Sequence, residues 1–365
     1  MFPRIALLVP EDRRAYDPLM RMTFGLLAML VACGDDRMIS EAPDAAVRDA
    51  APDSEVPTGC DYTEQRDLTN DDVASGTPEE TELTFTTRTV VCGTIDHTHF
   101  DGDITVDVDG FVIDVAAEVD VLVRLHGAGA ETIELVGVDV YTGPSLDQLV
   151  GTNTFYGDHA VTAIHLAPGR HELLGFALAG AAIAAPVAYR IEVVADLPAT
   201  RCPEVTTGGY PEAIDGATND GNDMIRLASG SPPSLSPLPT DLPEPTQLVL
   251  APGANTRVTG SAAAATVPDT YEDKDTFAIT TGSATNELAV RLDWPTATAN
   301  LDYFLFEADS ADPIVRAQST TARPEVRTFS VKPGTGYWLL VGAKVGATGL
   351  PAAYTGSLCG ATFTP

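Results

Sequence analysis

Positive charge is scarce in this chain of 365 residues, which has 21 lysine and arginine residues against 52 aspartate and glutamate residues and a formal net charge of -31. Its lysines are Lys274, Lys332 and Lys344. Nucleic acids and anionic lipid head groups bind through cationic side chains, so this electrostatic field repels both. The composition excludes a nucleic-acid-binding protein. It suits a solvated acidic surface, and it is compatible with cations, cationic partners or uncharged glycans.

Long hydrophobic runs are also missing. The apolar run over 24–31 is far shorter than the roughly 18 to 20 residues that a membrane-spanning helix needs. It follows Arg21 and ends in small residues before Cys33, which is typical of a secretory signal. Charged residues before Met20 fit a signal poorly, so we expect the true start at Met20 or Met22.

The tetrapeptide Leu-Val-Ala-Cys that ends at Cys33 resembles a bacterial lipoprotein signal. It implies that 1–32 is removed, that Cys33 is lipidated, and that several acyl chains anchor the protein at the outer membrane or cell surface. The alternative is an ordinary cleaved signal in which Cys33 has no role. The segment 33–58 is rich in acids, Ala and Pro and has no periodicity, which predicts a disordered acidic linker.

Long stretches of helix formers are absent, and the rest of the chain reads as many short strands in two similar units, 59–200 and 201–365. The sequence VLVRL from Val121 matches LAVRL from Leu288, and both units carry a later Pro-Gly turn. Alternating apolar and polar residues predict antiparallel strands with one wet face. We therefore expect an all-β chain of two tandem antiparallel β-sandwich domains, the second with a Pro-rich insertion over 229–245.

The order of these motifs, found twice, resembles the bacterial pre-peptidase C-terminal domain. The family has an acidic opening containing Asn, a strand ending in Gly, an Asp-x-Asp-x-Phe strand, a Pro-Gly turn and a closing Tyr strand. Matching positions here include Gly93 and Gly260, followed by Asp109 and Asp275. The resemblance implies a jelly-roll-like sandwich that accompanies a secreted enzyme or acts as a binding module. No catalytic domain precedes the repeats, so an accessory role would have to be exerted in trans.

Cysteine is rare, and four of the five cysteines lie in the repeated units. They are Cys60, Cys92, Cys202 and Cys359. Sequence alone allows three pairings, and the positions favour Cys60–Cys92 and Cys202–Cys359 because each pair stays within one repeat. Zinc-site and Cys-x-x-Cys spacings are missing, which favours structural disulfides over metal or redox roles.

Calcium is the sharpest site hypothesis, because it prefers carboxylate and carbonyl oxygens on loops. The resemblance implies ligands in the acidic opening and the Asp-rich strand entry of each unit. The matching residues are Glu64, Asn70, Asp107 and Asp109, and Glu212, Asn219, Asp273 and Asp275. Solvated acidic turns are the alternative, since Asp and Asn are ordinary turn formers.

Catalytic motifs are missing: the chain has no Gly-x-Ser-x-Gly elbow, Walker loop or His-Glu-x-x-His. We therefore expect a non-catalytic protein that binds carbohydrate or protein at the cell envelope. The alternatives are an accessory subunit of a separately encoded secreted peptidase or other hydrolase, and a structural surface spacer. Trp294 and Trp338 are candidate sugar platforms, although aromatic residues more often pack in a core.

Overall fold

The computed structural model describes most of the two repeated units. The described residues are 59–65, 78–95, 98–101, 103–106, 108–127, 136–143, 145–146, 148–154, 156–177, 187–196, 198–213, 243–264, 271–308, 310, 313–317 and 323–364. The predicted signal region and acidic linker lie outside these ranges, as does Cys33. Within them, no helix is long and apolar enough to cross a membrane.

The first half of the chain, called unit one, forms two five-stranded sheets, with strand orders β1-β3-β12-β7-β10 and β2-β6-β11-β8-β9. A separate pair, β4 and β5, forms a small hairpin. The strands are β1 (Tyr62–Thr63), β2 (Glu79–Phe85), β3 (Arg88–Ile95), β4 (Thr98–Asp101), β5 (Asp103–Val106), β6 (Val108–Val115), β7 (Val119–Gly127), β8 (Val136–Thr142), β9 (Gln148–Thr154), β10 (His159–Leu166), β11 (Gly169–Ala177) and β12 (Val187–Ala195).

The second half, called unit two, repeats this arrangement, with strand orders β13-β15-β22-β17-β20 and β14-β16-β21-β18-β19. A single helical turn, α2 (Pro198–Arg201), lies in the segment that joins the units. The strands are β13 (Tyr210–Pro211), β14 (Glu244–Leu250), β15 (Asn255–Ala262), β16 (Tyr271–Thr281), β17 (Glu287–Asp293), β18 (Leu301–Glu307), β19 (Pro313–Ala317), β20 (Glu325–Ser330), β21 (Gly336–Lys344) and β22 (Ala352–Ala361).

The all-β prediction is confirmed, but the sheets are not wholly antiparallel. The first strand of each sheet, namely β1, β2, β13 or β14, pairs in parallel with its neighbour. Parallel neighbours need a crossover rather than a hairpin. The chain supplies one by entering the other sheet between β2 and β6, and again between β14 and β16. Hydrophobic alternation predicts which face of a strand is buried, but it carries no information about the direction of the neighbouring strand.

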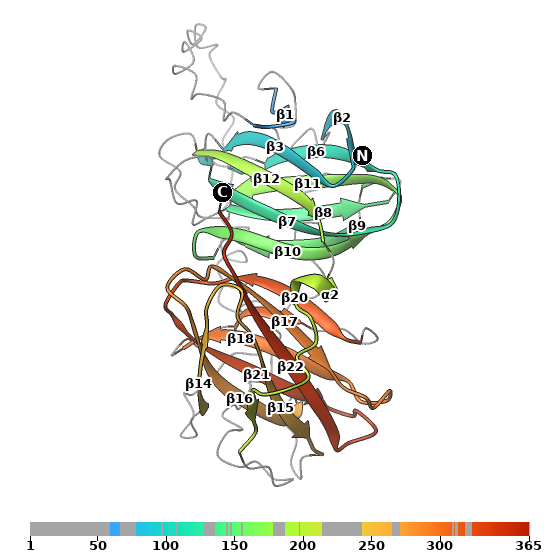
Figure 1. Cartoon of the computed structure of the whole chain (residues 1–365). Helices are drawn as coiled ribbons and strands as arrows, with labels where there is room; N and C mark the ends of the chain where they lie inside the picture. The colour runs from blue at the N-terminus through green and yellow to red at the C-terminus, as the bar shows by residue number, and fades with distance from the viewer. Residues whose placement is uncertain are drawn as a thin grey trace, which may run out of the picture.

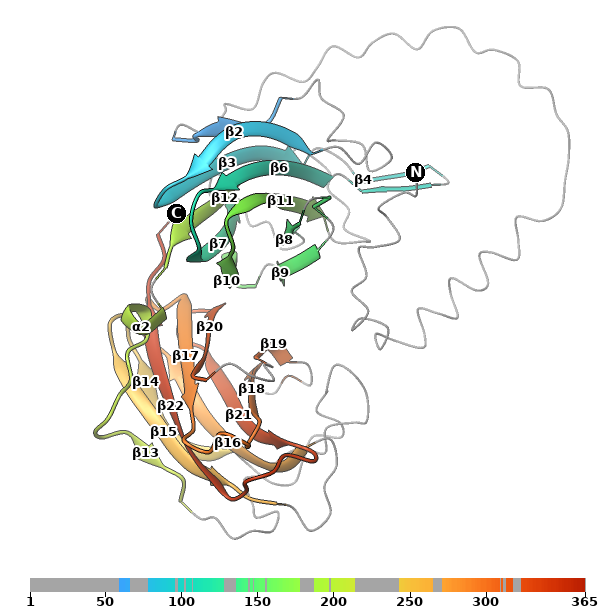
Figure 2. The ribbon, with the colours of Figure 1, turned by 90° about the vertical axis from the view of Figure 1, so that its right-hand side faces the viewer.

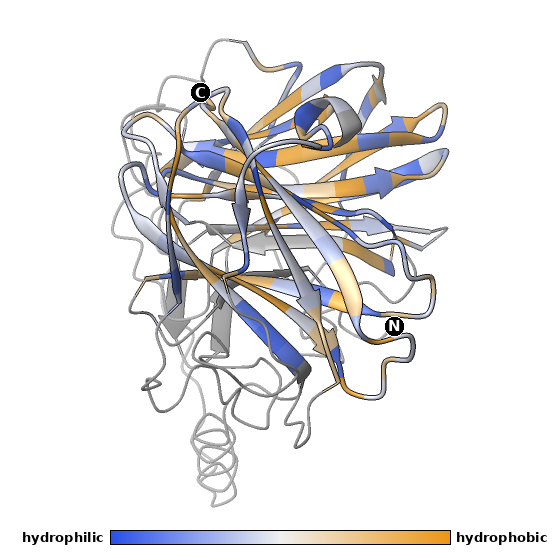
Figure 3. Cartoon of the chain, turned by 60° about the horizontal axis from the view of Figure 1, so that its bottom comes forward, coloured by the Kyte–Doolittle hydropathy of each residue, from blue (hydrophilic) through white to orange (hydrophobic). Residues whose placement is uncertain are grey.

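Each unit has one main core, to which both of its sheets contribute. In unit one, Val121, Val123 and Leu125 of β7 face Phe111 and Ile113 of β6 in the same buried cluster. In unit two the cluster contains the corresponding residues of β17 and β16. Hydrophobic and hydrophilic bands follow one another along several strands in Figure 3, whereas β18 and β21 are buried over most of their length. The packing is therefore sandwich-like, as expected for sheets with one apolar face.

The two units stack end to end, joined by the segment that carries α2 (Figures 1 and 2). The edge strands β10 and β20 contact each other across the junction. The C-terminal segment after β22 returns to unit one, where Figure 1 places the chain end beside β12 and β7. The predicted Pro-rich insertion over 229–245 stays a prediction over 229–242, which lies outside the described residues. Its last two positions belong to β14, which starts at Glu244.

Candidate functional site

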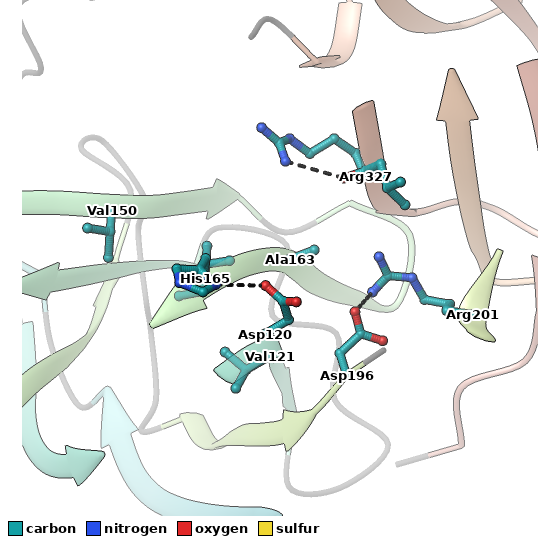
Figure 4. A pocket seen from close by; sticks show the side chains of 10 residues that line it. Asp120, Val121, Val150, Ala163, His165, Asp196, Arg201 and Arg327 are labelled. Atoms are coloured by element: carbon teal, nitrogen blue, oxygen red, sulfur yellow. Dashed lines mark hydrogen bonds and ion pairs between the residues drawn. The ribbon is translucent and has the colours of Figure 1, made fainter. Parts of the chain in front are cut away.

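A cavity of about 380 Å³ lies where the two units meet. Its walls come from β7, β9 and β10 of unit one, from the segment that joins the units, and from β20 of unit two (Figure 4). The lining residues are Asp120, Val121, Val150, Ala163, Ile164, His165, Asp196, Arg201, Val326 and Arg327. The cavity therefore depends on both units and on the link between them.

The unit-one wall carries a histidine held between two carboxylates. His165 Nδ1 lies 2.9 Å from Asp120 Oδ1, the contact dashed in Figure 4, and Nε2 lies 2.9 Å from Glu118 Oε1. The hydrogen bond with Asp120 is the main cause of a raised His165 pKa. Because the His165 side chain is half exposed, water screens these contacts. The arrangement favours the imidazolium form at the cavity wall.

The joining segment contributes an ion pair to the cavity. Arg201, the last residue of α2, donates from Nη1 to Asp196 Oδ2 at 2.6 Å. Both side chains are largely buried, and burial lowers the pKa of Arg201. The backbone N–H of Asp196 donates to the Asp120 carbonyl, which ties this segment to β7. On the unit-two side, Arg327 of β20 donates to the carbonyl of Val326 at 3.2 Å.

The cavity lining combines charged and aliphatic side chains. Three of the ten lining residues are His or Arg, two are Asp, and the other five are aliphatic. None of these ten is a Ser, Thr, Cys, Tyr or Lys, the usual side-chain nucleophiles besides carboxylates and histidine. Charged donors and acceptors beside aliphatic walls suit a small polar ligand that also has apolar faces.

The predicted calcium residues of unit two act as acceptors for backbone and tyrosine groups. Glu212 Oε2 accepts from the Ser261 N–H at 3.1 Å, and Asp275 Oδ2 accepts from the Tyr354 hydroxyl at 2.6 Å. Asp273 accepts from the Ala263 N–H. Burial, followed by contacts with Glu212, raises the pKa of Asp275 well above its usual range. These acids therefore fasten β16 to β22 and to the end of β15, and fasten the opening segment to β15.

Unit one repeats this arrangement. Glu64 Oε2 accepts from the Thr94 N–H at 2.7 Å, and Asp109 Oδ2 accepts from the Tyr189 hydroxyl at 2.5 Å. A Cβ atom at Gly93 would lie 2.3 Å from the Tyr189 hydroxyl oxygen, and one at Gly260 would lie equally close to that of Tyr354. The repeated glycine is thus explained by the close approach of a buried tyrosine.

These contacts do not assemble the predicted calcium ligands into a site. No group of three or more His, Cys, Asp or Glu side chains within the described ranges is arranged to hold a metal ion. Asn70, Asp107 and Asn219 lie outside those ranges. Calcium binding therefore stays a prediction, without a ligand set in the part of the chain that the structure describes.

The predicted sugar platforms are wrong, because both tryptophans are buried. Trp294 is 3% exposed in the unit-two core, where its Nε1–H donates to the Ala299 carbonyl at 2.9 Å. Trp338 is 9% exposed and packs with Phe304 and Phe306. Burying the apolar surface of the two rings stabilises the fold of unit two. Neither ring therefore offers a face to a sugar.

The disulfide prediction is confirmed in both units. Cys60 pairs with Cys92, and Cys202 pairs with Cys359. The first bridge fastens the opening segment to β3, and the second fastens the joining segment to β22. Each therefore closes one unit, as the repeat positions predicted.

Sequence reasoning missed the cavity residues altogether, because they meet only when two edge strands are brought together. Asp120 and Arg327 are 207 positions apart by their numbers, and no local motif joins them. One signal was available: every histidine of the chain lies in unit one, although the units are otherwise repeats. Two of these histidines, His159 and His165, lie on β10 at the junction.

No family model matches the chain, and no curated protein matches it in sequence. Similar solved structures include the pre-peptidase C-terminal domain of a Bacillus anthracis collagenase, at 12% identity over 32% of this chain and 96% of that chain, with a TM-score of 0.24. Another is the Aeromonas hydrophila PliG, a periplasmic inhibitor of g-type lysozyme, at 10% identity over 31% and 98%, with a TM-score of 0.21.

A longer match is the CUB1-EGF-CUB2 segment of rat MASP-1, at 13% identity over 78% of this chain and 100% of that chain, with a TM-score of 0.19. The first of the three belongs to the family that the motif order resembles. At these TM-scores the likenesses carry no argument about function. The described part of the chain is all-β, with four five-stranded sheets.

Proposed function

We propose that this protein is an exported bacterial lipoprotein that acts as a non-catalytic binding module at the cell envelope, for a carbohydrate or protein ligand. The observation that carries the proposal is the cavity at the junction, which combines charged groups from three segments with aliphatic walls. Such a lining provides hydrogen-bond donors and acceptors for polar groups and contact area for apolar faces. The cavity volume suits a sugar unit or a terminal side chain of a larger ligand.

The proposed export rests on the signal-like run before Cys33 and on two disulfides, which persist in oxidising compartments. We further propose that the two units are tandem jelly-roll-like sandwiches related to the pre-peptidase C-terminal domain. The repeated Gly, Asp and Tyr contacts, which join the same strands in both units, support this relationship.

The direct test of binding is a glycan and polysaccharide screen of the full chain, with calcium and with chelator. We expect saturable binding that Arg327→Gln weakens at least tenfold, because Arg327 lines the cavity. Arg170→Gln is the matched control, since Arg170 pairs with Glu80 on the unit-one surface and does not line the cavity. Binding that neither variant changes would place the ligand elsewhere.

The outcome of the screen also separates the alternatives. Binding lost with chelator would locate the ligand at the acidic loops and support calcium. Failure of every glycan would remove the carbohydrate ligand and favour a protein partner, such as the separately encoded peptidase or other hydrolase of the accessory-subunit hypothesis. Failure of both glycans and protein partners would leave a structural spacer.

Lipidation is tested separately from ligand binding. We expect metabolic labelling with a fatty acid to mark the wild-type chain in the membrane fraction, and Cys33→Ser to remove both label and membrane association. A Cys33→Ser chain that is exported and remains with the membrane unlabelled would contradict the anchor.

A further inference from the structure

A buried histidine forms the centre of the contact between the two units. His159, the first residue of β10, has a fully buried side chain, with Nδ1 2.5 Å from Asp158 Oδ1 and Nε2 3.1 Å from Glu287 Oε1. A neutral imidazole has only one N–H, so one of these carboxylates would face a lone pair. Both contacts are favourable only when the ring carries two protons and a positive charge.

The same carboxylate of unit two also binds an arginine of unit one. Arg124 donates from Nε to Glu287 Oε1 at 2.6 Å and from Nη2 to Oε2 at 3.1 Å. With His159 charged, two cations face two carboxylates, Asp158 and Glu287, and the charges cancel. Loss of the His159 proton would leave one uncompensated negative charge in a site where the Glu287 side chain is only 5% exposed.

The pKa shifts agree with this charge count. Burial lowers the pKa of His159, but hydrogen bonds with Asp158 and Glu287 outweigh burial and raise it above the usual 6.5. Burial raises the pKa of Glu287, but His159 and Arg124 bring it down to about 2. The ion pairs are therefore complete in mildly acidic solution.

The C-terminal segment covers this cluster. The Phe363 ring lies 4.8 Å from the His159 ring, and the Arg124 guanidinium lies 4.7 Å from the Phe363 ring centroid. The side chain of Asn286 donates to Asp158 Oδ2 and to the Phe363 carbonyl, each at 2.9 Å. Its Oδ1 accepts from the Phe363 N–H at 2.7 Å. The segment is thus fastened to both units at once.

Other titratable groups around the cluster do not change charge in the same pH range. His126, which also contacts Phe363, has a pKa lowered mainly by burial. Glu192 Oε2 lies 3.6 Å from Arg124 Nη1. A second contact lies nearby, where the Tyr156 hydroxyl donates to Glu307 and burial raises the pKa of Tyr156.

Lys332 completes that second contact, with Nζ 3.0 Å from Glu307 Oε2 and 4.8 Å from the centre of the Tyr156 ring. The Glu307, Lys332 and Tyr156 side chains of this second contact keep their usual charges between neutral and mildly alkaline pH. His165 of the cavity wall and Glu325 of β20, whose pKa burial raises to about 8, also change charge near this range, and of the three His159 is the one that contacts the Glu287 carboxylate.

We propose that Arg124, Asp158, His159, Asn286, Glu287 and Phe363 form a proton-dependent latch that fixes the orientation of the two units and thereby the cavity between β10 and β20. The latch regulates the site of the proposed function and rests on that proposal for its biological role. Its stability is complete between pH 4.5 and 6.5 and is lost as pH rises through the raised pKa of His159. On the acid side it weakens as pH falls from 4.5 towards 2, because Glu287 then gains a proton.

The first test is an NMR titration of the His159 ring in the full chain. We expect both ring nitrogens to be protonated at pH 6 and the titration midpoint to lie above 6.5. A midpoint at or below 6.5 would overturn the latch, whatever the ligand.

The second test measures hydrogen exchange at the Phe363 amide, together with small-angle scattering. In Glu287→Gln at pH 6 we expect exchange at least tenfold faster than in wild type, with a larger radius of gyration, because the amide side chain keeps the size but not the charge. Wild type should approach that state in alkaline solution. Glu80→Gln, which removes an exposed acid of unit one, is the matched control and should leave both readouts unchanged.

These outcomes are independent of ligand binding. Unchanged exchange and scattering in Glu287→Gln would contradict the latch even if the cavity binds a glycan. Loosening without any detectable ligand would uphold the latch and remove the proposed function. His159→Gln provides a second variant if Glu287→Gln fails to fold.

Discussion

Units one and two share their inner framework but differ at the edge strands that meet. Asp109 with Tyr189 and Asp275 with Tyr354 make the same buried contact. In the edge strands, Ala160 of β10 pairs with Leu125, whereas Glu325 of β20 pairs with the corresponding Leu292. The framework residues are set by packing within a unit, which both units require. The edge residues are set by the junction, where each unit has a different role.

The two disulfides should have the largest effect on the free energy of unfolding, and that effect should differ between the units. Cys202 and Cys359 are separated by 157 positions, and Cys60 and Cys92 by 32. Loop-closure entropy predicts a loss of about 5 kcal/mol when the first pair is replaced by Ala, and about 4 kcal/mol for the second. Guanidinium unfolding of the two double variants would measure this. A greater loss for the Cys60–Cys92 pair would contradict the entropic account.

Two arginines at matching positions of the repeat should contribute differently to the free energy of unfolding. Arg124 of VLVRL makes the buried pair with Glu287 across the junction, whereas Arg291 of LAVRL lies 3.4 Å from a partly exposed carboxylate of Asp293. Breaking a buried pair costs about 3 kcal/mol, whereas the longer pair of Arg291, whose Asp293 partner is 36% exposed, should cost about 1 kcal/mol. Thermal unfolding of Arg124→Gln and Arg291→Gln would show the difference. Equal losses would mean that the junction adds no stability.

Glu325 of β20 has no acidic counterpart in β10, so the pH dependence of stability tests the difference between the two edge strands. The residue is 1% exposed, and neither carboxylate oxygen has a hydrogen-bond partner within the described ranges. Burial raises its pKa to about 8, partly opposed by Arg327 and supported by Asp302. The unfolded chain loses this proton near pH 4.5, so stability falls as pH rises from 4.5 to about 8.

Glu325→Gln removes that loss, because an amide needs no ionisation. We expect it to stabilise unit two by about 1–3 kcal/mol at pH 8 and to have little effect at pH 4. Melting temperatures at the two pH values provide the measurement, with the exposed Glu80→Gln as control. A gain that is the same at both pH values would show that folding does not raise the pKa of Glu325.

His165 should have the smallest effect on stability. Its side chain is half exposed, so its contacts with Asp120 and Glu118 are screened by water. We expect His165→Asn to change the free energy of unfolding by less than about 0.5 kcal/mol, while weakening any ligand held in the cavity. Calorimetric unfolding beside a binding titration separates the two effects, and a large loss of stability would show that His165 belongs to the framework.

The repeat was predictable because its signals are local. Alternation in VLVRL and LAVRL predicted the buried faces of β7 and β17, and the repeat positions predicted both disulfides. The parallel first strands were not predictable, because strand direction depends on which sheet the chain enters next. Trp294, just after β17, and Trp338 of β21 remained candidate sugar platforms because the sequence does not indicate which side of a sheet is covered.

The candidate site was beyond sequence reasoning for a related reason. The cavity and the latch arise from side chains that are far apart in the chain and on different sheets, such as His159 and Glu287. Their positions in the repeat indicate that they lie in strands, but not that their side chains contact each other. The acidic residues that the sequence singled out instead accept hydrogen bonds within each unit.

The central claim is that the junction cavity binds the ligand. Methyl NMR of the full chain, with Val121, Val150, Ile164 and Val326 resolved, follows that cavity directly during a glycan titration. The account predicts saturable shifts at these four methyl-bearing residues, reduced in Arg327→Gln. Saturable shifts confined to other residues would contradict it.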